Sequence, residues 1–286
     1  MTDRFLPSCP LGCRADITPT LIELPEGNLR RCSQCGQLIS ACTPERYAQS
    51  MQEFNAPEGT MTSGKALERQ KKRIGRILMQ GIHHLSSSHD TVSMLDVGCS
   101  SGSVLKVGDS LGLKVHGVEP APRAAATARN LGFEVFTGFL HDAKYPNHAF
   151  DIITLFEVIE HLREPLVLAH EINRILKPGG VWLIGTGNAD SWTAHFMGAR
   201  WEYFDINKHG GHVSFFNPQS ISLLAQRSGF EMVEIITKRV SMANREDTSP
   251  WAYNMSRIAR ELCEVPARLL HKGHDMLAIF RKSCDV

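Results

Sequence analysis

The sequence predicts an α/β fold in which a mainly parallel sheet is covered by helices on both faces. From residue 92 onward, short apolar runs alternate with segments of helical periodicity. The apolar runs are continuous rather than alternating, which is typical of strands buried on both faces. Glycines and prolines separate the two kinds of segment, as in LDVGCSSG and LKPGG.

The expected elements follow one another in a regular order. Strands are expected at residues 94–97, 115–118, 133–136, 150–155, 181–184, 230–237 and 276–281. Helices are expected at residues 104–111, 123–131, 220–228 and 251–270, with a further one that ends within 176–180. The order of the first ten elements predicts repeated βα units.

The helix at residues 251–270 carries one apolar stripe with several arginines opposite. The stripe contains Trp251, Met255, Ile258, Leu262 and Val265. It predicts packing on the domain or on a second subunit, which would make the protein a homodimer. Docking on a membrane surface is the alternative.

Composition and length fit a globular protein with one sizeable domain and a small appendage. The chain has 286 residues, of which 42% are hydrophobic and 21% charged, and this excludes a disordered chain. A formal net charge of +1 gives no strong nucleic-acid signature. The sequence opens without a secretory signal and holds no apolar run near the roughly 18–20 residues of a spanning helix. We therefore expect a cytoplasmic protein without a transmembrane segment.

Four segments are expected along the chain. They are a four-cysteine module at residues 1–45, a helical linker at 46–90, the main α/β domain at 91–244, and an amphipathic helix with the final strand at 245–286. Within the main domain, residues 188–217 are expected to form a lid. The charged run at residues 68–73 is most simply the solvated face of the linker helix.

A nucleoside-binding site is expected where the first strand of the main domain ends. Gly98 and Gly102 lie in the turn that follows this strand, and glycines let a ligand approach the backbone closely. Glu119 ends the second strand, where a carboxylate can accept hydrogen bonds from both ribose hydroxyls. The spacing lacks the G-x-G-x-x-G pattern of a pyrophosphate site, which disfavours a nicotinamide enzyme.

Four segments together resemble a known family. LDVGCSSG, VHGVEP, FDIITLFEVIEHL and LKPGGVWLIGT resemble, in order and spacing, the sequence blocks of class I S-adenosylmethionine-dependent methyltransferases. The resemblance covers about residues 94–238 and is strongest to ubiquinone-pathway O-methyltransferases and saccharide-modifying methyltransferases. It implies a Rossmann-like seven-stranded sheet whose last strand is antiparallel, and S-adenosylmethionine as cofactor.

The same resemblance assigns the cofactor-binding residues. It implies that the methionine portion lies against Asp96, Gly98, Cys99, Ser100 and Gly102. It places Glu119 and Pro120 at the ribose, and Leu140, Asp142 and Phe156 near the adenine or the methyl group. Ser100 stands where the family commonly has a glycine, and a residue this small remains compatible with binding.

The candidate catalytic residues are Glu157, Glu160, His161 and His212. The first three follow the fourth strand, where ligands meet an open α/β sheet. His161 or His212 could act as general base, or all four could bind a divalent cation that orients the acceptor. The cation-binding interpretation rests on a resemblance of these residues to those of small-RNA 2′-O-methyltransferases and ubiquinone-pathway enzymes. A structural role, in which Glu160 and His161 only orient a helix, is the third.

An aromatic segment at residues 201–204 precedes His212. Its position between a strand and a helix suggests a lid whose rings could stack on a flat or saccharide acceptor.

The N-terminal cysteines form two pairs, Cys9-x3-Cys13 and Cys32-x2-Cys35. Four thiolates so spaced predict a structural zinc site in a zinc-ribbon-like module. Free thiols or a redox pair are the alternatives, and Cys42 could substitute as a ligand. A closed four-thiolate site has no open position for catalysis, so the module is expected to be structural or to position the substrate.

The leading functional hypothesis is methyl transfer to oxygen, or less readily to carbon, on a small molecule or saccharide precursor. RNA methylation is the second hypothesis, and it predicts that binding to RNA weakens steeply as the salt concentration rises. A cofactor-binding regulatory protein without turnover is the third.

Overall fold

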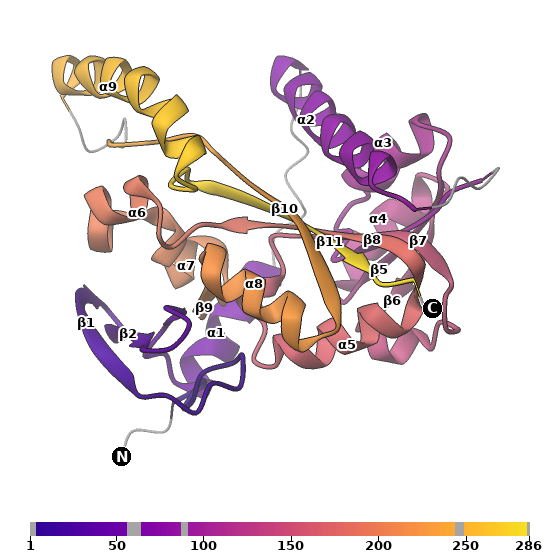
Figure 1. The fold of residues 1–286 in the computed structure, drawn as a ribbon, viewed down its shortest axis with the longest axis horizontal. Coiled ribbons are helices and arrows are strands. Elements are labelled where there is room, and N and C mark those ends of the chain that lie inside the picture. Colours follow the sequence, from indigo (N-terminus) through magenta and orange to yellow (C-terminus); the bar gives the residue numbers. More distant parts are fainter. Residues whose placement is uncertain (1–3, 56–63, 87–90, 244–248, 285–286) are drawn as a thin grey trace.

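The computed structural model describes residues 4–55, 64–86, 91–243 and 249–284. Within these ranges, the side chains of residues 53–55, 64–67, 209, 250 and 252–259 are not described. The central feature is a seven-stranded sheet with the strand order β10-β11-β8-β7-β4-β5-β6 (Figure 1). Its strands are β4 (Ser93–Val97), β5 (Lys114–Glu119), β6 (Glu134–Thr137), β7 (Phe150–Phe156), β8 (Leu176–Gly187), β10 (Phe230–Lys238) and β11 (Asp275–Lys282).

The last strand, β11, runs antiparallel to both of its neighbours, β8 and β10. The other neighbouring pairs in the sheet, from β8 through β7, β4 and β5 to β6, are parallel. This arrangement confirms the predicted Rossmann-like sheet with an antiparallel last strand.

Helices cover both faces of the sheet. α2 (Gly64–His83) and α3 (Ser103–Ser110) pack on one face, while α5 (Pro165–Ile175) and α8 (Pro218–Arg227) pack on the other (Figure 1). α4 (Pro122–Asn130) lies along β5 and β6. Neighbouring strand residues point to opposite faces: Met94 joins the core under α2 and α3, and Leu95 joins the core under α5 and α8.

One predicted boundary differs from the structure. The sequence predicts a helix that ends within residues 176–180, but α5 ends at Ile175 and Leu176 already pairs with Phe150 of β7. Pro178 cannot donate a backbone hydrogen bond to a continuing helix, and the buried Leu176 is more favourable in the sheet. The helix therefore gives way to β8 earlier than expected.

A second, four-stranded sheet has the order β1-β2-β3-β9. β1 (Ile17–Leu24), β2 (Gly27–Cys32) and β3 (Leu38–Ile39) come from the N-terminal module, and α1 (Pro44–Asn55) follows them. β9 (Ser214–Phe215) comes from the segment expected to be a lid, which also contains α6 (Trp192–Met197), the 3₁₀ helices η3 (Gly198–Arg200) and η4 (Glu202–Phe204), and α7 (Ile206–His209). The module and this segment thus share one sheet.

α9 (Pro250–Leu269) projects from the body and contacts β10 (Figure 1). The described apolar side chains Trp251, Leu262 and Val265 are exposed, so they do not pack on the domain. Met255 and Ile258 lie outside the described side chains. A second subunit or a membrane surface as the cover of this stripe stays a prediction. Within the described part of the chain, the helices are all too short or too polar to cross a bilayer.

Candidate functional site

The turn after β4 has the bare backbone that a cofactor site requires. Gly98 and Gly102 have φ angles of 79° and 85°, which favour glycine. A Cβ atom at Gly98 would lie 2.4 Å from Cγ2 of Val158. Ser100 adopts a φ of 47° without being glycine, so the position where the family commonly has glycine keeps the left-handed conformation. The turn therefore lies directly against the segment that follows β7.

Glu119 holds this turn in place. Its Oε2 accepts a hydrogen bond from Ser100 N at 2.9 Å, and its Oε1 accepts one from Ala121 N at 2.8 Å. A carboxylate oxygen can accept two hydrogen bonds. Each oxygen therefore retains acceptor capacity for a ribose hydroxyl.

Asp96 lies beneath the turn. It is 2% exposed, and its Oδ1 accepts a hydrogen bond from Thr154 Oγ1 at 2.6 Å. Burial raises the pKa of this carboxyl to about 7, in spite of the hydrogen bond from Thr154. Asp96 therefore links the two central strands, β4 and β7, at the edge where the turn begins.

The remaining predicted cofactor residues differ in exposure. Cys99 is buried, with its Sγ against Gly117, so its backbone rather than its side chain is available at the turn. Leu140 is buried in the 3₁₀ helix η1 (Leu140–Ala143), whereas Asp142 is exposed and pairs with His141. Phe156 is half-buried at the end of β7 against Gly185, and Pro120 is exposed after β5. Their contact with cofactor stays a prediction.

The second group of polar side chains follows β7. Glu157 has a φ of 54°, and its backbone N donates to Gly185 O at 2.9 Å. Glu160 and His161 lie in the 3₁₀ helix η2 (Ile159–His161). The left-handed residue turns the chain so that both glutamates meet the same tyrosine, Tyr203. These residues and His212 form what we call the acceptor cluster: Glu157, Glu160, His161, Tyr203 and His212.

Tyr203 is the member of this cluster that sequence reasoning missed. Its phenol oxygen lies 3.2 Å from Glu157 Oε2, forms a short hydrogen bond to Glu160 Oε1, and accepts one from Gly187 N at 2.9 Å. The Thr186 hydroxyl lies 2.9 Å from the same oxygen. The aromatic segment 201–204 was the available signal, but it suggested stacking on the acceptor. The rings of Trp201, Tyr203 and Phe204 are instead buried and pack on one another.

Burial dominates the electrostatics of the acceptor cluster. It raises the pKa of Glu157 and raises that of Glu160 well above its ordinary value, with the neighbouring Glu157 charge adding to the effect on Glu160. Burial also raises the pKa of Tyr203. Both carboxyls therefore hold their protons more tightly than an exposed glutamate does.

Three of these residues have the geometry of a cation site. One ligand atom each from Glu160, His161 and His212 lies within 4.8 Å of the others. His212 Nδ1 lies 3.0 Å from Tyr203 O. A carbonyl can only accept, so this nitrogen donates, and Nε2 lies 3.6 Å from Glu160 Oε1. Ligand histidines are commonly fixed through the other ring nitrogen in this way.

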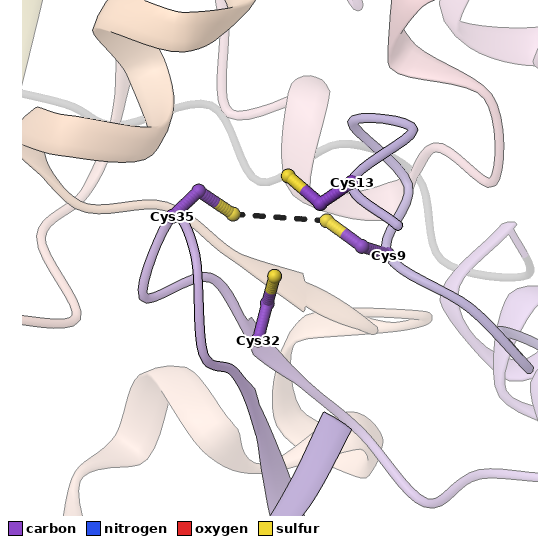
Figure 2. A group of neighbouring side chains, drawn as sticks. All are labelled: Cys9, Cys13, Cys32 and Cys35. Atoms are coloured by element: carbon purple, nitrogen blue, oxygen red, sulfur yellow. Dashed lines mark hydrogen bonds between the residues drawn. The ribbon is translucent and has the colours of Figure 1, made fainter. Parts of the chain in front are cut away.

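The four N-terminal cysteines converge in the same manner (Figure 2). Their sulfurs all lie within 4.8 Å of one another: Cys9, Cys13, Cys32 and Cys35. The Sγ atoms of Cys9 and Cys35 are 3.7 Å apart. A tetrahedral zinc ion with Zn–S bonds of about 2.3 Å places sulfurs about 3.8 Å apart, so the residues fit this metal.

The neighbouring thiols shift one another's pKa values. Hydrogen bonding with Cys35 lowers the pKa of Cys9 to about 5, and the same bond raises the pKa of Cys35. Burial raises the pKa of Cys13 to about 11. A bound divalent cation would favour the thiolate at all four positions. Cys42 lies apart from this group and donates to Thr43 O at 3.2 Å, so it is not a substitute ligand in this arrangement.

The known proteins that resemble this chain in sequence are methyltransferases. A family model described as a methyltransferase domain matches residues 44–235. A ubiquinone biosynthesis O-methyltransferase of Thiobacillus denitrificans is 27% identical over 154 residues, which is 50% of this chain and 66% of the relative. One from Cereibacter sphaeroides is 28% identical over 151 residues, 49% of this chain and 61% of the relative. The match therefore spans just under two thirds of these relatives' lengths.

Solved structures show the same fold. A SAM-dependent methyltransferase of Archaeoglobus fulgidus has a TM-score of 0.53 at 18% identity, covering 74% of this chain and 94% of its own. A SAM-dependent methyltransferase of Methanosarcina mazei has a TM-score of 0.52 at 16% identity, covering 71% and 97%. These similarities support the fold that the sequence predicts.

Proposed function

The chain belongs to the methyltransferase domain family as a class I S-adenosylmethionine-dependent enzyme, and from this premise we propose that it O-methylates a small molecule or saccharide precursor. The observation that carries the proposal is the contact between the two halves of the site. Val158, which lies between Glu157 and Glu160, packs on Gly98 of the cofactor turn. The acceptor cluster therefore adjoins the place where a methyl donor would lie.

The residues of the turn fit the cofactor. Gly98 and Gly102 give the turn its left-handed backbone, and Glu119 keeps acceptor capacity for the ribose hydroxyls. When bound, S-adenosylmethionine supplies a methyl group on a positively charged sulfur. Transfer needs an acceptor oxygen in line with the carbon–sulfur bond. The new carbon–oxygen bond forms as that bond breaks, and the acceptor hydroxyl loses its proton.

The acceptor cluster is suited to the removal of that proton. Glu160, His161 and His212 would hold a divalent cation, and such an ion lowers the pKa of a bound hydroxyl. Glu157 lies beside them and would orient the acceptor or take up its proton. Tyr203 keeps both carboxylates in place. In the general-base interpretation, His161 or His212 takes the proton without a cation. Methyl transfer would then continue in the presence of a chelator.

The test is a screen with methyl-labelled cofactor against nucleotide sugars, phenolic quinone precursors and total RNA. We expect labelling of a small-molecule acceptor, loss of labelling with EDTA, and recovery with Mg²⁺ or Mn²⁺. His212→Gln should lower turnover about 100-fold or more with unchanged cofactor affinity. His195→Gln is the matched control, because His195 lies on α6 and is not part of the cluster.

Other outcomes would contradict specific parts of the proposal. Labelling that survives EDTA would favour the general base over the cation. Labelling of RNA alone, with binding that falls steeply with salt, would identify an RNA methyltransferase. Tight cofactor binding with no labelled product in any pool would indicate a regulatory protein.

A further inference from the structure

The N-terminal module reaches the acceptor cluster through β9. Ile39 of β3 pairs with Ser214 of β9. Gln37 Nε2 strengthens this pairing by donating to Ser214 Oγ at 2.7 Å, and both side chains are buried. Since Ser214 comes two residues after His212, a displacement of β3 would move the chain next to His212.

Val213 connects the two regions through its own peptide groups. Its carbonyl oxygen accepts a hydrogen bond from Ser40 N at 2.9 Å, and its N–H donates to Glu160 O at 3.0 Å. Ser40 follows β3, while Glu160 belongs to the acceptor cluster. Val213 is completely buried, so water does not compete for these bonds. One residue therefore joins the module, Glu160 and His212.

α1 provides a second connection. Tyr47 on this helix donates from its hydroxyl to His161 O at 3.1 Å. Its ring and Met51 also close over Gly211, where an added Cβ would lie 2.9 Å from Tyr47 Cε2 and 2.5 Å from Met51 Sδ. Gly211 directly precedes His212 and has a φ of 69°. The module and the helix α1 that follows it thus contact the backbone on both sides of His212 as well as that of His161.

The cysteine site fixes the strand that makes these contacts. Cys32 ends β2, and its backbone N donates to Gln37 O at 3.0 Å. Cys35 lies between β2 and β3, and its carbonyl accepts from Asn217 Nδ2 at 3.4 Å. The four cysteines belong to the same buried cluster as Phe216 and residues of α8. A metal ion on the four sulfurs would therefore set the position of β3 relative to β9.

We propose that the N-terminal module, together with the helix α1 that follows it, is a positioning element of the acceptor site, with metal occupancy of the four cysteines determining the geometry of Glu160, His161 and His212. The inference rests on the proposed function, since it takes these three residues as the acceptor side. Tyr47 and Gln37 act as positioning residues that do not contact the acceptor. The module has little core of its own, so a four-thiolate metal would supply much of its folding free energy.

The cofactor turn is predicted to be independent of the module. The contacts that hold Gly98, Gly102 and Glu119 come from β5, α4 and Val158. Loss of the metal should therefore affect the acceptor cluster and leave cofactor binding intact.

Hydrogen–deuterium exchange of the full chain tests the coupling without a known acceptor. The zinc-loaded protein is compared with the double variant Cys32→Ser, Cys35→Ser, with zinc content measured by mass spectrometry. We expect at least 10-fold faster exchange at the Val213 amide and unchanged exchange at residues 96–102. S-adenosylmethionine affinity should stay within twofold, which also shows that the main domain is folded. Unchanged exchange at Val213 in a zinc-free, cofactor-binding protein would overturn the inference.

Two milder substitutions keep the test informative if the cysteine variant fails to fold. Gly211→Ala places a Cβ against Tyr47 and Met51, whereas Gly112→Ala introduces a Cβ at a similar φ of 80° with nothing within 4 Å. Only Gly211→Ala should accelerate exchange at Val213. Tyr47→Phe should accelerate exchange in the peptide that contains His161 by a smaller factor, and it keeps the ring on Gly211. Equal exchange in Gly211→Ala and Gly112→Ala would contradict the inference.

Mn²⁺ binding, followed by electron paramagnetic resonance, separates this inference from the proposed function. We expect Mn²⁺ affinity to fall at least 10-fold in Gly211→Ala and to be unchanged in Gly112→Ala. If the zinc-loaded wild type binds no Mn²⁺, the cation in the proposed function is wrong, and the exchange data still decide the coupling. If all variants bind Mn²⁺ equally, the cation stands and the positioning role is wrong.

Discussion

The cofactor turn and the acceptor cluster lie at the same edge of one sheet but are built in different ways. The turn consists of neighbouring residues, from Gly98 to Gly102, with one carboxylate from the adjacent strand. The acceptor cluster brings together residues after β7, residues of the lid segment, and contacts from the N-terminal module. On the proposed function, the site for a common cofactor is local, while the site for a particular acceptor depends on distant segments.

The largest expected effect concerns the buried carboxyl of the cofactor side. The pKa of Asp96 rises from 3.8 to about 7 on folding, so the folded protein holds this proton more tightly than the unfolded chain. The free energy of unfolding of the cofactor-free protein should therefore fall as pH rises from about 4 to about 7, by up to about 4 kcal/mol. Denaturant unfolding across this pH range, with Asp96→Asn as comparison, measures it.

Asp96→Asn should remove only the part of this pH dependence of stability that comes from Asp96. The pKa values of Glu157 and Glu160 are also raised. Glu160→Gln should therefore remove a further part of the pH dependence of stability, the part that comes from the acceptor cluster. Identical pH profiles for Asp96→Asn and the wild type would show that Asp96 does not contribute to the pH dependence of stability.

Gly98→Ala should disrupt the contact between the two halves of the site. A Cβ 2.4 Å from Val158 Cγ2 at a φ of 79° should cost about 3 kcal/mol of stability or cofactor affinity. Calorimetric titration with S-adenosylmethionine and thermal unfolding measure the two quantities. Gly132→Ala, at a φ of 93° with nothing within 4 Å, is the control for backbone strain alone, and an equal loss there would argue against the contact.

Glu119→Ala should affect the cofactor and leave the acceptor cluster unchanged. Removing a charged hydrogen-bond acceptor should weaken S-adenosylmethionine binding by about 1.5–3 kcal/mol. Calorimetry gives the affinity, and Mn²⁺ binding shows whether the acceptor cluster is intact. An unchanged cofactor affinity would exclude Glu119 from the ribose site.

Tyr203→Phe should have the converse and smallest effect. The substitution removes the oxygen shared by Glu157, Glu160 and Gly187 N, at a cost of about 1–2 kcal/mol of stability. Cofactor affinity should be unchanged, while Mn²⁺ binding and turnover should fall. If Tyr203→Phe weakened cofactor binding as much as Glu119→Ala does, the two sides would not be separable.

Much of the fold follows from local pattern. Short apolar segments predicted each strand of the large sheet, and the family resemblance of the four sequence blocks implied its antiparallel last strand. The predicted end of α5 was wrong because Leu176 is already extended and pairs with Phe150 of β7. The four-stranded sheet was not foreseen, because it joins β3 to β9 across about 175 residues of chain and its strands are only two residues long there.

The sequence by itself determined the class I sheet, the turn with Glu119, and the cysteine spacing that fits zinc. These features depend on residues close in the chain, whose spacing limits what geometry they can adopt. Only the tertiary structure showed that Tyr203 joins the two glutamates and that the cysteine module contacts the backbone beside His212. Such contacts depend on how separate elements pack, and that packing leaves no periodic signal in the sequence.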